Sequence, residues 1–239
     1  MNATPPLEPG LTLVEQPDVG ALHRLILDSD TDGETLWVDA GGAASTYGLT
    51  AQVPNRRALR GIKVARAFTA HQHHELVRTC VAEASGRTGL VVAPNVAALY
   101  EAADASDAEI EPLFEAAVAL LSDLADALAI PVLVSAPRAT AEHRAAIDDA
   151  ADREIACEST GLGYAYETEG FETQGYFHEG WWQTTIPYWA QLCGVRAWDE
   201  AWATARTSAT AAAIDRGAID PNAATPQTSQ SPIAAEGGW

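Results

Sequence analysis

The sequence predicts an α/β protein built on a mostly parallel sheet with helices on its faces. From residue 11 to about residue 135, short apolar runs alternate with longer segments of helical periodicity, a pattern typical of βαβ units. The run 90–93 (LVVA) is apolar throughout, which is typical of a strand buried on both faces. Hydrophobic residues make up 47% of the 239 residues, so the chain can bury a sizeable core.

Parallel strands are expected where short apolar runs stand between turn-forming residues, at 11–15, 35–39, 62–67, 90–93 and 130–135. Helices are expected where apolar residues recur every three or four positions, at 20–28, 56–60, 71–85 and 110–129. The helix at 71–85 is entered through Thr69. The clearest helix is 110–129, because its leucines fall on one face and Asp123 and Asp126 turn outward.

The chain changes character after about residue 150. Three short antiparallel strands separated by Gly-containing turns are expected at 154–157, 163–168 and 175–178. An aromatic-rich stretch over 181–202, expected to include helices, follows, and residues 216–239 have the composition of a disordered tail. We therefore expect a lead-in over 1–10, one α/β domain over 11–215 and a tail over 216–239.

The chain is strongly acidic. It carries 33 Asp and Glu against 14 Lys and Arg, with Lys63 as the single lysine and a net charge of −19. Such a surface repels polyanions at low ionic strength, but molar salt shortens the Debye length to about 3 Å and screens the repulsion. This composition indicates a halophilic protein. Because salt also screens attraction, net charge does not decide whether the chain binds nucleic acid.

The sequence also indicates a cytoplasmic protein that does not enter a membrane. No apolar run approaches the roughly 18 residues that cross a bilayer, and residues 1–10 lack the pattern of a signal peptide. The three cysteines, Cys80, Cys157 and Cys193, are odd in number and show no CxxC spacing. We therefore expect free thiols in a reducing compartment.

The first strand, loop and helix have the layout of a phosphate-binding loop but not its residues. Such a loop needs Gly at both ends, a Lys for the β- and γ-phosphates, and a Ser or Thr for Mg²⁺. Here Glu15 stands at the first Gly, Gly20 fits the second, and Ala21 and Leu22 replace the Lys and the Thr. The carboxylates of Glu15 and Asp18 would repel a triphosphate. We therefore expect no nucleotide cofactor.

The segment 64–73 (VARAFTAHQH) resembles the VARAF…HHQ stretch of archaeal recombinases of the RecA/RadA family. TLWVDAGG, LVVAPNV and IPVLVSAPR are similar, in the same order, to that family's second strand, its Mg²⁺-binding strand and the strand before its DNA-facing loop. The similarity covers about residues 11–165 and implies a RecA-like fold. By position, it puts the family's catalytic acid at Gly41 and its Mg²⁺-associated Asp at Pro94, or at Ala93 with a one-residue slip.

The resemblance thus implies a RecA-like paralogue that has lost four residues of nucleotide chemistry, replaced by Ala21, Leu22, Gly41 and Pro94. Without the Lys and Mg²⁺, the charge stabilisation needed for phosphoryl transfer is missing. We expect a pseudo-ATPase that acts by binding a protein partner, for example a recombinase, in DNA recombination or repair. The process follows from the resemblance alone.

Aromatic residues near the C-terminus form the main positive feature of the sequence: Trp181, Trp182, Tyr188, Trp189, Trp198 and Trp202. They either close the core over the sheet, or anchor a protein partner, or stack on single-stranded nucleic acid. The sequence leaves these roles open. DNA contact through the loop after 130–135 is less favoured, because Arg138, Arg144 and Arg153 stand among four carboxylates.

A small-molecule or metal-dependent enzyme acting at the carboxyl ends of the strands is the remaining alternative. Asp39 ends a strand at such a position, although the capping of a turn is its simpler role. His71, His73, His74 and Glu75 have spacings that place two or three metal ligands on one helix face. No HExxH motif is present, so we expect an exposed, polar helix start and no metal.

Overall fold

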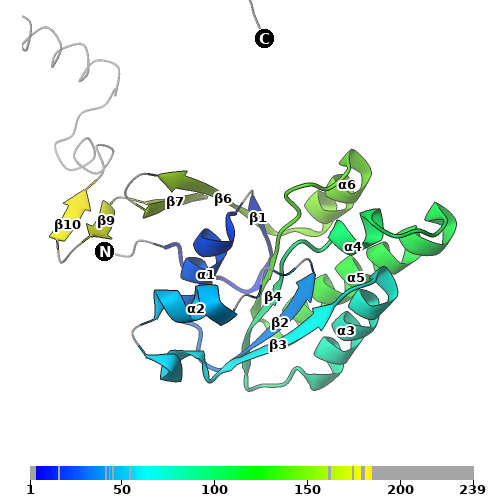
Figure 1. The fold of residues 1–239 in the computed structure, drawn as a ribbon, viewed down its shortest axis with the longest axis horizontal. Coiled ribbons are helices and arrows are strands. Elements are labelled where there is room, and N and C mark those ends of the chain that lie inside the picture. Colours follow the sequence, from blue (N-terminus) through cyan, green and yellow to red (C-terminus); the bar gives the residue numbers. More distant parts are fainter. Residues whose placement is uncertain are drawn as a thin grey trace, which may run out of the picture. The chain divides into compact units, whose positions relative to one another are not determined.

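The computed structural model describes residues 4–15, 17–40, 42, 44, 46–53, 55–160, 163–173, 175–178 and 181–184, all within one compact unit. The chain forms a sheet of eight strands in the order β3-β2-β4-β5-β1-β6-β7-β8, with helices on both faces (Figure 1). The predicted α/β class, with a mostly parallel sheet and an antiparallel C-terminal part, is therefore confirmed.

Six strands point in the same direction and form the parallel part of the sheet. They are β1 (Gly10–Glu15), β2 (Glu34–Ala40), β3 (Ile62–Ala67), β4 (Thr88–Ala93), β5 (Pro131–Val134) and β6 (Arg153–Thr160). The antiparallel strands are β7 (Gly163–Thr168) and β8 (Phe171–Glu172), which extend the sheet, and β9 (Gly175–His178) and β10 (Trp181–Thr184), which pair with each other.

The described helices are α1 (Val19–Leu27), α2 (Thr46–Gln52), the 3₁₀ helix η1 (Arg56–Leu59), α3 (Ala70–Glu83), α4 (Ala98–Glu101), α5 (Asp107–Leu128) and α6 (Ala141–Ala150). The sequence did not predict α2, α4 or α6. The antiparallel strands predicted at 154–157 and 163–168 are found as the hairpin of β6 and β7. The parallel pairing of β6 with β1 was not predicted. Helix α6 connects β5 to β6, and a helical crossover returns the chain in the same direction.

Successive residues of the central strands belong to two separate cores, because strand side chains point alternately to the two faces of the sheet. On one face Val91 packs in the same cluster as Phe114 of α5. On the other face Val92 packs in the same cluster as Leu25 of α1. Helices α3, α4, α5 and α6 cover the first face, and α1 and α2 cover the second (Figure 1). No described helix is both long and apolar enough to cross a membrane.

The aromatic cluster falls mostly outside the described residues. Trp181 and Trp182 lie in β10. The described residues do not include Tyr188, Trp189, Trp198, Trp202 or the tail predicted over 216–239. The three roles left open for the cluster therefore stay predictions.

Helix α3 begins at Thr69 as predicted, because the Thr69 side chain accepts a hydrogen bond from the backbone N–H of Gln72. The prediction of an exposed helix start is wrong at His73, which is fully buried. Residues 73, 77 and 80 share the buried face of α3, so the helical period turns this imidazole into the core. His73 Nδ1 lies 2.9 Å from the Tyr100 hydroxyl, and burial lowers the pKa of His73 to about 4.

The buried His73 predicts a pH dependence of stability. Its pKa falls from 6.5 to about 4 on folding, so between these values the unfolded chain binds a proton that the folded chain does not. The free energy of unfolding therefore rises with pH from about 4 to about 6.5, by at most about 3 kcal/mol. Urea titrations at pH 4.5 and 7.5 should show a smaller difference for His73→Gln than for the parent chain. The exposed control His71→Gln should keep the parent difference; identical differences in all three chains would contradict the assignment.

Candidate functional site

A crevice lies at the carboxyl ends of β1, β4 and β5, where open α/β sheets bind their ligands. Its volume is about 750 Å³. The segment after β1 contributes Asp18 and Val19, the segment after β4 contributes Asn95, and Glu101 of α4 and Arg138 after β5 complete its polar lining. Two of the segments expected at a nucleotide site, those after β1 and β4, therefore meet at one edge of the sheet.

The residues that replace the phosphate-binding Lys and Thr do not line this crevice. Ala21 and Leu22 are 1% and 3% exposed and belong to the core between α1 and the sheet. Pro94 is buried in the turn after β4, and Gly41 lies outside the described residues. Their correspondence to the four lost residues of a nucleotide site therefore stays a prediction.

The N-terminus of α1 is occupied by a side chain of the chain itself. Asp18 is its N-cap residue, and Asp18 Oδ1 accepts a hydrogen bond of 2.8 Å from the backbone N–H of Ala21. Backbone N–H groups at a helix N-terminus are the donors that bind a phosphate in nucleotide sites. Here one of these donors is taken by a carboxylate, which satisfies it and brings a negative charge to the helix end.

Two tyrosines of β7 hold this helix start in place. The Tyr166 hydroxyl donates a hydrogen bond of 2.8 Å to the carbonyl of Ala21. A Cβ atom on Gly20 would lie 2.0 Å from the Tyr164 hydroxyl oxygen. Partial burial and the negative charge of Asp18 raise the pKa of Tyr164. Gly20, the one residue that fits the phosphate-loop pattern, therefore allows the close approach of Tyr164 of β7.

Glu15, at the end of β1, forms an ion pair with Arg144 of α6. Arg144 Nε also lies 2.7 Å from Asp148 Oδ1, and these two carboxylates raise the pKa of the Arg144 guanidinium. Arg153 lies 3.0 Å from Glu8. Of the three arginines considered for DNA contact, Arg144 and Arg153 are thus engaged by carboxylates, and Arg138 lines the crevice.

Asp39 organises the loop after β2. Its side chain is fully buried, and its Oδ1 accepts a hydrogen bond of 3.0 Å from the backbone N–H of Ala44. Its Oδ2 lies 2.6 Å from Arg66 Nε, and Arg66 also donates to the Ala44 carbonyl. The interpretation of Asp39 as a turn-capping residue is confirmed. Both carboxylate oxygens of Asp39 are thus engaged within the loop and by Arg66.

The histidines of α3 do not converge on a common point. His71 Nε2 lies 3.3 Å from Glu109, His73 bonds to Tyr100, and His74 Nδ1 lies 3.2 Å from the carbonyl oxygen of Leu113. Among the described residues no three His, Cys, Asp or Glu side chains are grouped in a way that could hold a metal ion. The described cysteines, Cys80 and Cys157, are free thiols whose pKa values burial raises to about 11 and about 12, so they are weak nucleophiles at neutral pH.

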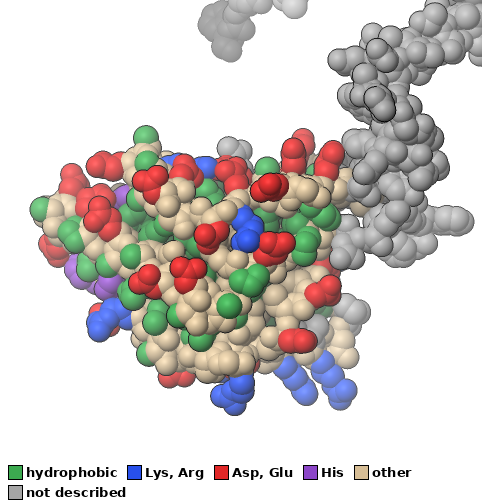
Figure 2. Space-filling view, turned by 180° about the vertical axis from the view of Figure 1, so that it is seen from behind, with side chains coloured by type: hydrophobic (Ala, Val, Ile, Leu, Met, Phe, Trp, Pro, Cys, Tyr) green, Lys and Arg blue, Asp and Glu red, His purple; other side chains and the backbone are tan. Residues whose placement is uncertain are grey.

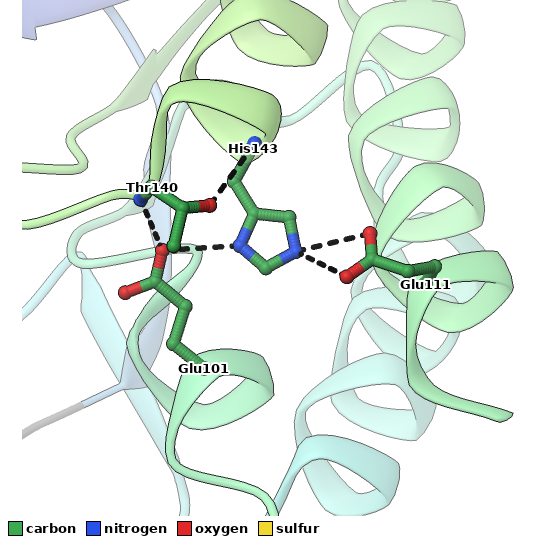
Figure 3. Close-up of polar contacts among 4 residues, drawn as sticks. All are labelled: Glu101, Glu111, Thr140 and His143. Carbon is green, nitrogen blue, oxygen red and sulfur yellow. Dashed lines mark hydrogen bonds and ion pairs between the residues drawn. The ribbon is translucent and has the colours of Figure 1, made fainter. Parts of the chain in front are cut away.

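Beside the crevice lies a histidine that the sequence did not single out (Figure 3). His143 of α6 is 5% exposed; its Nδ1 lies 3.1 Å from Glu101 of α4, and its Nε2 lies 3.1 Å from both carboxylate oxygens of Glu111 of α5. Glu101 also accepts a hydrogen bond of 2.5 Å from the backbone N–H of Thr140.

This network has a positioning role. It joins three helices and fixes Glu101 on the wall of the crevice, while Phe114 packs against the imidazole with ring centroids 4.1 Å apart. Among the contacts described, the ring nitrogens of His143 meet the two carboxylates, and the Thr140 hydroxyl accepts from its backbone N–H. No sequence signal could have revealed the network, because its members are 32 and 42 positions apart.

No model of a known protein family matches the chain, and no curated protein matches its sequence at a significant level. The resemblance to the recombinases therefore stays a prediction from motifs. The site is defined here by its own geometry.

Gly20 and Tyr164 are expected to be energetically coupled. Replacing a helical Gly by Ala ordinarily gains up to about 1 kcal/mol, but here the added methyl overlaps the Tyr164 hydroxyl. Gly20→Ala should therefore lower the free energy of unfolding of the parent chain by about 1–3 kcal/mol. In a Tyr164→Ala background the same substitution should raise it. Denaturant titrations of the four chains measure this coupling, and equal effects in both backgrounds would show that the contact is unimportant.

Proposed function

We propose that the protein is a non-catalytic chain of RecA-like fold that acts by binding a protein partner in DNA recombination or repair. The fold assignment is supported by the places of the three most similar runs in the sheet. VARA falls on β3, LVVA on β4 and PVLV on β5, and the last two strands flank the crevice together with β1. The process is inferred from the motif resemblance alone.

The observation that carries the non-catalytic assignment is the carboxylate of Asp18 at the start of α1. A triphosphate in the crevice would meet the carboxylates of Asp18 and Glu101, and Arg138 is the only cation among the described residues that line it. A phosphate would also have to displace Asp18 from the N–H of Ala21. Phosphoryl transfer depends on cations placed around the transferred group, and this lining does not provide them.

The feature that supports partner binding is the outer edge of β3. Within the described sheet β3 is an edge strand, and the backbone N–H and C=O groups of such an edge can pair with an added strand. Val64 on β3 is 42% exposed, and Phe68 just after it is 73% exposed. A mostly apolar groove of about 170 Å³ lies between β3 and α3 and includes Val64 and Leu76. An extended segment of a partner could pair with β3 and place one apolar side chain in this groove.

A nucleotide titration tests the non-catalytic assignment. Calorimetry of the full chain with ATP and Mg²⁺ in molar KCl should show no binding up to millimolar concentration, and phosphate release should equal that of buffer. Asp18→Asn, which removes the charge but keeps a capping oxygen, should behave alike because the Lys and Thr are also missing. Micromolar binding of ATP, or turnover that stops when Mg²⁺ is chelated, would overturn the assignment.

Partner binding is tested at the edge of β3 with two matched substitutions. The immobilised full chain should retain a cellular protein in molar KCl, and Val64→Lys should abolish this retention because a charge replaces an exposed apolar side chain on the edge strand. Val19→Lys is the control, since Val19 is 46% exposed but lines the crevice. If only Val19→Lys abolishes the retention, the interface lies at the crevice. If the parent chain retains no protein, the result counts against partner binding.

A further inference from the structure

One segment of this acidic chain, which begins directly after the buried Asp39, contains no acidic residue. From residue 40 to residue 74 there is no Asp or Glu, although the overall composition would place about five there. The same segment holds five of the 14 basic residues: Arg56, Arg57, Arg60, Lys63 and Arg66. Basic charge in this chain is therefore concentrated on η1 and β3.

The fold brings a further cation to this segment. Arg57, Arg60, Lys63 and Arg87 are all exposed, and we call these four residues the basic strip. Lys63 Nζ lies 2.6 Å from Glu34, and the charges of both Lys63 and Arg87 lower the pKa of that carboxyl. The backbone N–H of Glu34 donates to the Arg87 carbonyl, and that of Thr35 donates to the Gly61 carbonyl. The amino ends of β3 and β4 are thus joined through β2.

The basic strip is continuous with the edge of β3. Lys63 belongs to the strip and also lines the apolar groove between β3 and α3. Lys and Arg side chains project along the lower margin of the molecule in Figure 2, on the side where η1 lies in Figure 1, while Asp and Glu are spread over the rest of the face. Lys63 therefore links the basic strip to the groove.

We propose that the basic strip and the adjoining edge of β3 bind an acidic, extended segment of a protein partner. This inference rests on the proposed function and specifies its partner. The segment would add a strand to β3, place an apolar side chain in the groove and direct carboxylates towards Arg57, Arg60 and Lys63. Alternate residues of a strand point the same way at a spacing of about 7 Å, so successive carboxylates on one side can reach different cations.

Molar salt allows this acidic chain to bind an acidic segment. In molar KCl the long-range repulsion from the net charge is screened, and only charges in near contact act. Backbone hydrogen bonds to β3 and burial in the groove persist under these conditions, and the ion pairs add selectivity. An acidic chain can thus bind an acidic segment at the basic strip.

A second copy of this chain fits the surface less well. Pairing of two β3 edges would bring the Lys63 and Arg66 side chains of one copy near the same cations of the other, which is how natural edge strands avoid self-association.

Nucleic acid also fits the surface less well than an acidic protein segment. A strand carries a phosphate at every step of about 3.4 Å, whereas the strip has four cations, of which Lys63 is already paired with Glu34. On the elements next to the strip, Asp32 before β2 and Glu83 on α3 are exposed carboxylates.

Fluorescence anisotropy with defined probes tests the proposal. The probes are labelled peptides of alternating Val with Glu, Gln or Lys, and an oligothymidylate of similar length, each in 0.2 M and 2 M KCl. The full parent chain should bind the Glu peptide at least tenfold more tightly than the Lys peptide. Arg57→Glu combined with Arg60→Glu should remove that preference. The control, Arg24→Glu combined with Arg78→Glu, makes the same charge change at exposed sites elsewhere and should keep it.

The outcomes separate this inference from the proposed function. If the Gln peptide binds as tightly as the Glu peptide, and Val64→Lys weakens both while charge reversal on the strip has no effect, the edge of β3 is a partner site and the acidic preference is wrong. If the oligothymidylate binds more tightly than the Glu peptide and charge reversal removes this binding, the strip is a nucleic-acid surface. If no peptide binds the parent chain at millimolar concentration, the proposal is overturned. Urea titration of each variant confirms that it folds.

Discussion

The carboxylate of Asp18, bonded to the backbone N–H of Ala21, occupies the helix start around which the crevice is built. A helix N-terminus carries partial positive charge and unsatisfied donors, and an anion there is stabilising. In nucleotide-binding proteins of this layout the anion is the ligand's phosphate. Here the chain provides its own anion, so the segment after β1 has a satisfied conformation without any ligand. Other features of the site follow from this one.

The antiparallel end of the sheet is built around the same helix start. Tyr166 bonds to the carbonyl of Ala21, and Tyr164 lies so close to Gly20 that a side chain there would require the Tyr164 ring to move. The hairpin of β6 and β7 therefore packs against α1. Strand β1, which lies beside β6, is linked to α6 by the ion pair of Glu15 with Arg144. On the far wall of the crevice, His143 joins α4, α5 and α6 through two carboxylates. The crevice walls are thus held by contacts within the chain.

The two edges of the described sheet differ in the surface they offer. At one edge stands β8, which has two residues and provides little backbone for pairing. At the other stands β3, which has six residues, exposes Val64 and borders both the apolar groove and the basic strip. Charged side chains on an edge discourage pairing with a like edge and leave it available to a segment of opposite charge. The functional surface that we propose is therefore on β3, away from the crevice.

The sequence by itself determined the α/β class, the five parallel strands up to residue 135 and the capping of α3 by Thr69, because apolar period and capping residues act locally. It also showed that the phosphate-loop residues are missing. Only the tertiary structure decided that His73 is buried, that β6 runs parallel to β1, and that Glu101, Glu111 and His143 meet. It also decided that Gly20 packs against Tyr164 and that Lys63 and Arg87 lie near the same carboxylate, that of Glu34. Local pattern fixes which way a side chain points within its element, whereas its neighbours depend on how distant elements pack.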